Sequence, residues 1–114
     1  MANFYKNAFY DPTTTAVIEV YTCPSNANAI IQNIQVTNES GSKIVKASIN
    51  DDSVSTIFQI AYVYITGPTI CNLASGPIIL EENDVIRLES SVTSGISATL
   101  AILEINRDDQ NGQN

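Results

Sequence analysis

The chain contains no histidine and no tryptophan, and it carries little charge of either sign. Its 114 residues include 12 acidic and 5 basic ones, which gives a net charge of −7. Without histidine there is no imidazole base, no histidine-containing catalytic triad and no histidine ligand for zinc. The basic residues are scattered along the sequence: Lys6, Lys43, Lys46, Arg87 and Arg107. Because contact with nucleic acid phosphates needs clustered basic residues, we expect no nucleic acid partner.

Long apolar runs are missing too. No segment approaches the roughly 18 consecutive apolar residues that a membrane helix needs, so we expect no membrane contact. Residues 1–6 show no apolar core of a signal peptide, and we therefore expect a chain made in the cytoplasm. In that reducing compartment the two cysteines, Cys23 and Cys71, are expected to be free thiols, with a disulfide between them as the alternative.

What the sequence has in abundance is β-branched residues. Isoleucine and valine together number 24 against 5 leucines, and there are 10 threonines. Branching at Cβ restricts χ1 in helices and suits the pleated surface of a sheet. A chain of this length forms one domain. The composition therefore predicts a single all-β domain.

Turn residues at close spacing divide the chain into short strands. We predict strands over residues 13–22, 28–38, 43–50, 55–66, 69–73, 78–80, 85–91 and 96–105. Seven or eight short strands without a helix predict an antiparallel β-sandwich, jelly-roll-like in type. A seven-stranded immunoglobulin-type sandwich is the nearest alternative, but the tryptophan usual in its core is missing.

The side-chain alternation predicts which strands are most deeply buried. Residues 55–66 and 96–105 are apolar on both faces, so we expect both at the centre of the sandwich. In the strand over residues 28–38, the alternation places Ile30 and Ile34 on one face and Ile31 on the other.

The two ends differ from the rest of the chain. Residues 1–12 hold half of all the aromatic residues and show no clear periodicity, so we interpret them as an N-terminal arm. Residues 13–105 form the predicted sandwich domain, and residues 106–114 are a polar C-terminal tail. Apolar rings on an arm must be buried somewhere. We expect the arm to dock on another chain, the alternative being an edge strand of its own sandwich.

No residue pattern in the chain indicates a catalytic, cofactor or metal site. The acidic pairs 51–52 and 108–109, and the acidic group 81–84, are interpreted as solvated turns, because none has the spacing of a calcium loop. Asn83 is expected in the left-handed conformation of a tight turn. Tyr62 and Tyr64 alternate on an apolar strand, which favours a core or interface role over stacking on a sugar.

Three segments carry a resemblance to a known family: residues 20–24 (VYTCP), 29–38 (AIIQNIQVTN) and 79–88 (ILEENDVIRL). Together they resemble small β-sandwich virion proteins of tailed bacteriophages, including those of cyanobacteria. The resemblance spans about residues 20–105 and contains no catalytic signature. Asn83 stands where a glycine is more usual, and Cys23 where an apolar residue is; neither departure changes the expected fold.

The resemblance implies a non-enzymatic structural subunit of a virion, made in the host cytoplasm. A capsid decoration (cement) protein is favoured, because a small domain with an arm suits binding to a lattice; a tail, neck or fibre component is the alternative. Its partners would be copies of itself, with a trimer preferred, and the major capsid or tail proteins of the virion. The interface candidates are all aromatic: Phe4, Tyr5, Phe9, Tyr10, Phe58, Tyr62 and Tyr64. The alternative of another class is a carbohydrate-binding module that uses Tyr62 and Tyr64.

Overall fold

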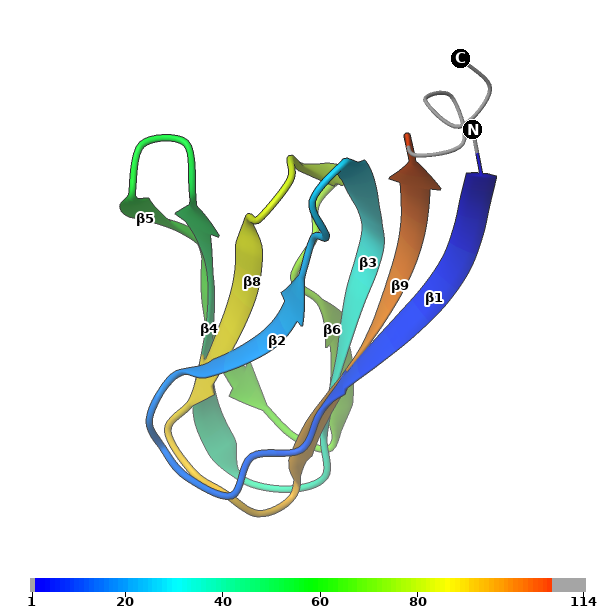
Figure 1. Ribbon diagram of the computed structural model, residues 1–114. Coiled ribbons are helices and arrows are strands. Elements are labelled where there is room, and N and C mark those ends of the chain that lie inside the picture. The colour runs from blue at the N-terminus through cyan, green and yellow to red at the C-terminus, as the bar shows by residue number, and fades with distance from the viewer. Residues whose placement is uncertain (1, 108–114) are drawn as a thin grey trace.

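Two antiparallel sheets pack face to face in the computed structural model, which describes residues 2–107 (Figure 1). The strands are β1 (Ala2–Tyr10), β2 (Ile18–Thr22), β3 (Ala27–Asn38), β4 (Ser42–Asp51), β5 (Thr56–Thr66), β6 (Thr69–Asn72), β7 (Ile78–Leu80), β8 (Val85–Ser90) and β9 (Ile96–Asn106). No helix occurs in this range. The predicted all-β sandwich is thus confirmed, with nine strands instead of seven or eight.

One sheet has five strands and the other has four. The five-stranded sheet has the order β1-β9-β3-β6, and β7 also pairs with β3. The four-stranded sheet has the order β2-β8-β4-β5. Strands β9 and β3 pair over almost their whole length, from Ala27↔Asn106 to Asn38↔Ile96. Since β9 also pairs with β1, the prediction that residues 96–105 lie centrally is confirmed.

The other strand predicted at the centre lies at an edge instead. β5 pairs with β4 on one side and ends the four-stranded sheet. Its side chains at Ala61, Val63 and Ile65 turn toward the core, whereas Tyr62 and Tyr64 are 59% and 67% exposed. The prediction that residues 55–66 are central is therefore wrong. A strand that is apolar on both faces was expected to be covered on both, but no element within residues 2–107 covers the outer face of β5.

A bulge in β3 corrects a second expectation. The register between β3 and β9 shifts between Ile31 and Asn33, so Gln32 is an extra residue on β3. The shift reverses the alternation, because an inserted residue rotates the following side chains to the opposite face. As a result Ile31 and Ile34 are both fully buried, while Ile30 is only half-buried.

The N-terminal segment is an edge strand of its own sandwich. β1 runs antiparallel to β9 from Ala2↔Asn106 to Tyr10↔Ala98. Tyr10 is 2% exposed and belongs to the hydrophobic core. The expectation of an arm that docks elsewhere is thus corrected to the alternative: Ala8 and Tyr10 gain core contact, and the backbone of β1 pairs with β9 along its length.

The structure also bears on four local expectations, which concern a turn, the cysteines, the C-terminal tail and membrane helices. Asn83 has a φ of 71°, which confirms its left-handed conformation. Cys23 and Cys71 are free thiols, the first buried and the second half-buried. Of the predicted polar tail, Asn106 ends β9, and residues 108–114 lie outside the described residues. Within residues 2–107 no helix has the length and apolarity required to cross a membrane.

Candidate functional site

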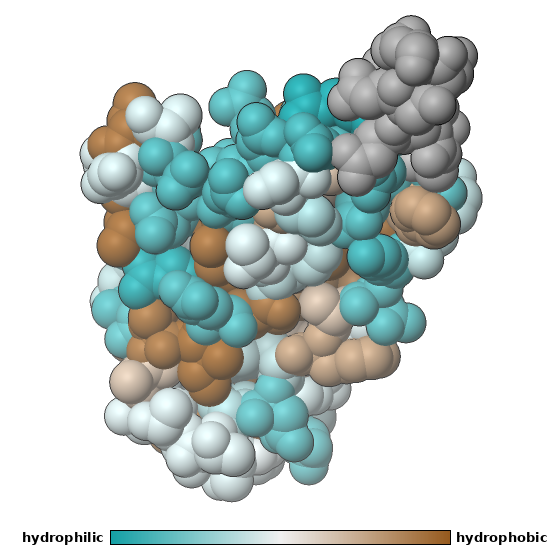
Figure 2. All heavy atoms as spheres, viewed as in Figure 1, coloured by the Kyte–Doolittle hydropathy of each residue, from teal (hydrophilic) through white to brown (hydrophobic). Residues whose placement is uncertain are grey.

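The largest group of exposed apolar side chains belongs to β5. Four of its members, called the β5 surface below, are Ile57, Ile60, Tyr62 and Tyr64; Phe58 is also half exposed, but beyond the bulge it lies opposite Ile49, on the inner face of the sheet. Figure 2 shows brown, apolar residues along the side of the molecule where β4 and β5 lie in Figure 1. Exposed apolar side chains gathered on one strand make β5 a candidate interaction surface.

The register of the β4–β5 hairpin explains why the tyrosines point outward. Tyr62 lies opposite Lys46, and Tyr64 lies opposite Ile44, on the face of the sheet turned away from the core. The Lys46 ammonium lies 5.0 Å from the centroid of the Tyr62 ring, within cation–π range. Val63 faces inward between the two rings, opposite Val45. Both tyrosines are therefore held on a pleated, hydrogen-bonded surface.

A shallow depression of about 270 Å³ adjoins Tyr62 on this face. Its lining is mostly polar and consists of Thr15, Ile44, Lys46, Tyr62, Glu89, Ser90 and Ser91. An aromatic ring bordered by hydroxyl, carboxylate and ammonium groups has the chemical character to bind a sugar or a polar peptide segment.

A second apolar row crosses the outer face of the five-stranded sheet. Tyr5 lies opposite Leu103 on β9, Leu103 lies opposite Ile30 on β3, and Ile30 lies opposite Ile79 on β7. The ends of this row are the most open, with Tyr5 80% exposed and Ile79 59% exposed. The two faces of the sandwich thus each present an apolar strip to the exterior.

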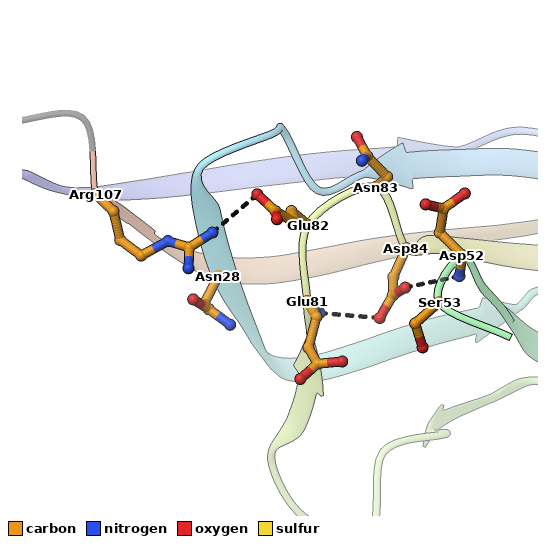
Figure 3. A pocket seen from close by; sticks show the side chains of 8 residues that line it. All are labelled: Asn28, Asp52, Ser53, Glu81, Glu82, Asn83, Asp84 and Arg107. Carbon is orange, nitrogen blue, oxygen red and sulfur yellow. Dashed lines mark hydrogen bonds and ion pairs between the residues drawn. The ribbon is translucent and has the colours of Figure 1, made fainter.

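One end of the sandwich carries an acidic depression of about 310 Å³ (Figure 3). It is lined by Asn28, Asp52, Ser53, Glu81, Glu82, Asn83, Asp84 and Arg107. Arg107 Nη2 lies 2.9 Å from Glu82 Oε2, and that carboxylate also accepts a hydrogen bond from the Asn26 backbone N–H. In the described part of the chain, no three histidine, cysteine, aspartate or glutamate side chains are arranged to hold a metal ion.

Asp84 has a structural task in this depression. It is almost fully buried, and its two carboxylate oxygens accept backbone N–H groups of Asp52 at 3.0 Å and Glu81 at 2.9 Å, as Figure 3 shows. The backbone carbonyl of Asp84 also accepts the N–H of Cys23. Asp84 therefore ties three turns together, and its hydrogen-bonding capacity is used within the fold.

A buried carboxylate joins the two sheets. Glu104 on β9 is 2% exposed; it accepts a hydrogen bond from the Tyr21 hydroxyl at 2.5 Å and forms an ion pair with Lys6 at 3.0 Å. Tyr21 belongs to β2 and Lys6 to β1, so the group connects three strands. Burial, together with the hydrogen bond and the charge of Glu104, raises the pKa of Tyr21 well above its usual range.

A buried lysine holds the turns at the end of the sandwich opposite the acidic depression. Lys43 on β4 is almost fully buried, and its ammonium donates hydrogen bonds to the Asn38 side-chain oxygen at 2.6 Å and to the Ser40 carbonyl. The amide nitrogen of Asn38 donates in turn to the carbonyls of Gly41 and Ile65. These contacts satisfy the polar groups that the turns bury.

Cys23 lacks the environment of a nucleophile. Burial, with a smaller effect of the Glu104 and Asp84 charges, raises the pKa of its thiol to about 11. The Sγ atom donates weakly to the Ala27 carbonyl at 3.5 Å. A reactive cysteine needs the opposite shift, toward the thiolate. The thiol therefore acts as a small apolar core group.

The seven predicted interface residues differ in how exposed they are. Tyr5, Phe9, Phe58, Tyr62 and Tyr64 are at least half exposed, and Phe4 is nearly so. Tyr10 is in the core of its own chain, which corrects its candidacy as an interface residue. The residues do not form one patch, because β1 and β5 belong to opposite sheets.

Glu104 is the residue that sequence reasoning missed. Its position could have been found, because Ala98, Leu100 and Ile102 alternate on the inward face and Glu104 follows in the same phase. A carboxylate on a buried face needs a cation or a hydrogen-bond donor. Its partners, Lys6 and Tyr21, come from strands whose pairing the sequence did not reveal.

Comparisons with known proteins find similarity in fold but not in sequence. No protein-family profile matches the chain, and no curated protein matches it either. A chain of the infectious bursal disease virus particle superposes with a TM-score of 0.55 at 6% identity, over 91% of this chain and 31% of that one. A chain of the capsid of Helicobacter pylori bacteriophage KHP30 does so with a TM-score of 0.55 at 12% identity, over 92% and 88%.

A third similar structure comes from outside viruses. A chain of the disulfide-linked pili of Bacillus endospore appendages superposes with a TM-score of 0.52 at 6% identity, over 91% of this chain and 88% of that one. This chain therefore spans about a third of the infectious bursal disease virus chain and most of the other two. At such identities the likeness establishes the β-sandwich fold alone.

Proposed function

We propose that this protein is a non-enzymatic structural subunit of a virion. The observation that carries the proposal is the pairing of this fold with its surface: a sandwich like those in two viral particles presents apolar strips on both outer faces. Its buried polar residues, among them Asp84, Glu104 and Lys43, are used in holding strands and turns together. A shell protein needs adhesive faces and a rigid body, and the chain has both.

Within the virion, capsid decoration is the role we favour. A sandwich of this size with apolar rows on opposite faces can contact a shell with one face and neighbouring copies with another. A tail, neck or fibre component of a tailed phage would need similar surfaces and is the alternative. The acidic depression and the net charge of −7 suit the exterior of a particle, where like charges keep particles apart.

Self-association is part of the proposal, with a trimer as the preferred order. A trimer needs contact between two different surfaces of the chain, in contrast to a dimer, which uses the same surface twice. The row from Tyr5 to Ile79 provides one such surface, which leaves the β5 surface free for a further contact. Binding of many copies to a shell also compensates for weak individual contacts.

Mass spectrometry of gradient-purified virions, calibrated for copy number, tests this function. We expect the chain to co-sediment with the particles in many copies, and cryo-electron microscopy to locate it on the shell. A chain that is abundant in the lysate but missing from purified particles would contradict the proposal.

A carbohydrate-binding module is the second candidate, supported by the exposure of Tyr62 and Tyr64 beside a polar depression. A glycan array with the purified protein tests it. Glycan binding that is lost in Tyr62→Ala and kept in Tyr5→Ala would support this role. If the protein binds no glycan on the array, this candidate function is wrong. Tyr5 is a suitable control because it is a tyrosine on the other sheet and is even more exposed, at 80% against 59% for Tyr62.

A further inference from the structure

The four-stranded sheet has an unprotected edge. Among the described strands, β5 pairs with β4 alone, so its outer backbone edge has no neighbouring strand. A free edge of this kind is a template for pairing with a further strand, and proteins normally protect such edges with charges, bulges or short strands.

The other edges of the sandwich carry such protection. β1 has an inward-pointing charged residue, Lys6, in contact with Glu104. β2 has five residues, with Glu19 at a bulge, and β6 and β7 have four and three residues. By contrast, β5 has 11 residues, and none of them is charged. Its one irregularity, opposite Ala47 and Ser48, leaves residues 61–66 as a regular strand.

We propose that two copies of this chain pair through β5, antiparallel across a two-fold axis, so that their four-stranded sheets join into one. Charge favours a second copy as the occupant. The chain has a net charge of −7, yet this edge brings no charged side chain of its own strand into the contact. A self-pairing edge must avoid like charges directly opposite each other, and β5 meets that condition.

The side-chain alternation also fits self-pairing. In an antiparallel pair, residues directly opposite each other point to the same face. With an axis at Val63, Tyr62 of one copy lies opposite Tyr64 of the second copy on the outer face, while Ala61 lies opposite Ile65 on the inner face. Aromatic pairs of this kind stabilise antiparallel strands. The axis can also lie at Tyr62 or at Tyr64. In both cases each outward-facing residue of this segment still lies opposite an outward-facing residue of the second copy.

The exposed area on β5 is small for a stable interface. Tyr62 and Tyr64 each carry an aromatic surface of about 150–250 Å², of which 59% and 67% is exposed. The β5 surface therefore offers a few hundred Å² per copy, below the roughly 800 Å² per partner of a standard stable interface. We expect a weak dimer, with a dissociation constant on the order of 10–100 µM.

Sedimentation velocity over a range from about 1 µM to about 1 mM tests the pairing. The two-fold contact can join two single chains or two trimers. The expected result is therefore a doubling of the mass of the species that is present at low concentration. We expect wild type to double and Tyr64→Lys to double at least about tenfold less readily, because the change removes the aromatic pair and places two like charges on the same face close to the axis. Ile79→Lys, an equally exposed site on the other sheet, should double like wild type. A wild type that does not double, or a Tyr64→Lys variant that doubles equally well, would overturn the proposal.

Cysteine cross-linking gives a second readout that does not depend on the fold of the lysine variant. In a Cys71→Ser background, Tyr62→Cys, Tyr64→Cys and their 1:1 mixture cover the three possible axis positions. At least one should form an intermolecular disulfide rapidly, since opposite Cα atoms in a ladder lie within disulfide range. Ile79→Cys is the matched control, and equal cross-linking there would contradict the pairing. Neither experiment involves particles, so failure here leaves the virion role standing, and absence from virions leaves the pairing standing.

Discussion

The hydroxyl of Tyr21 on β2 donates a hydrogen bond to Glu104 on β9, at 2.5 Å, and so joins the two sheets through the core. Lys6 on β1 lies 3.0 Å from the other oxygen of the same carboxylate. Because Glu104 is 2% exposed, its charge depends on these partners in place of water. The contact fixes how the edge strands β1 and β2 meet at one side of the sandwich.

Removing this carboxylate should be costly. We expect Glu104→Ala to lower the free energy of unfolding by about 2–3 kcal/mol, because it leaves the half-buried hydroxyl of Tyr21 without its acceptor and opens space in the core. Lys6 is partly exposed and can regain water, which keeps the loss at that level. Urea unfolding followed by circular dichroism measures it.

Glu82→Ala is the control for that experiment. It breaks the exposed ion pair with Arg107, and an exposed pair contributes less than about 1 kcal/mol. Equal losses in the two variants would show that Glu104 does not hold the sheets together.

The bulge at Gln32 predicts unequal losses of stability for two adjacent isoleucines. Ile31→Ala should destabilise the protein by about 3 kcal/mol, because Ile31 is fully buried and truncation leaves a cavity. Ile30→Ala, on the half-buried outer face, should cost about 1 kcal/mol. Thermal unfolding compares them. The reverse order would mean that the strand follows the unbroken alternation with Ile30 inward.

Two tyrosine-to-phenylalanine changes should differ in sign. The Tyr10 hydroxyl is buried with no hydrogen-bond partner among the described residues, so Tyr10→Phe should be neutral or stabilising by about 1 kcal/mol. Tyr21→Phe deletes the donor to Glu104 and should destabilise by about 1–2 kcal/mol. Chemical denaturation of both variants measures the difference. A destabilising Tyr10→Phe would show that the hydroxyl is satisfied.

Alkaline pH should weaken the fold through Cys23. Its pKa rises from 9.0 to about 11 on folding, because burial disfavours the thiolate. The unfolded chain therefore loses its proton first, and stability that is present below pH 9 is lost as the pH rises toward 11. Between pH 9 and pH 10.5 this thiol should account for a loss of about 1.5 kcal/mol.

Tyr10, with a pKa raised to about 12, adds to the loss above pH 10. The measurement is the free energy of unfolding against pH in wild type and in Cys23→Ala. The variant should show a shallower decline over pH 9–11. Parallel curves would contradict a buried, protonated thiol.

The strands from residue 27 onward could be predicted from the sequence because turn residues bound each one and the β-branched residues alternate. The edge position of β5 could not be predicted. An apolar strand has the same sequence pattern whether its own chain covers it or its surface stays exposed for a partner. β1 was missed for a related reason. Its inward Lys6 breaks the alternation, and the partner that makes this tolerable, Glu104, is almost a hundred residues away.

Part of the candidate surface could be predicted from the sequence. Tyr62 and Tyr64 were identified from their alternation, and the structure places them on an open face. The row from Tyr5 to Ile79 could not be predicted, because it depends on the registers of four strands. Local pattern reveals which residues share a strand face, but strand order decides which faces meet.

Particles assembled without this chain provide the most direct test of the virion role. They are incubated with the purified protein and imaged by cryo-electron microscopy. We predict saturable density for the sandwich at symmetry-equivalent positions on the outside of the shell, together with a rise in the temperature at which the shell opens. Density confined to the tail would contradict decoration, and no bound density at saturating protein would contradict a structural role on the particle.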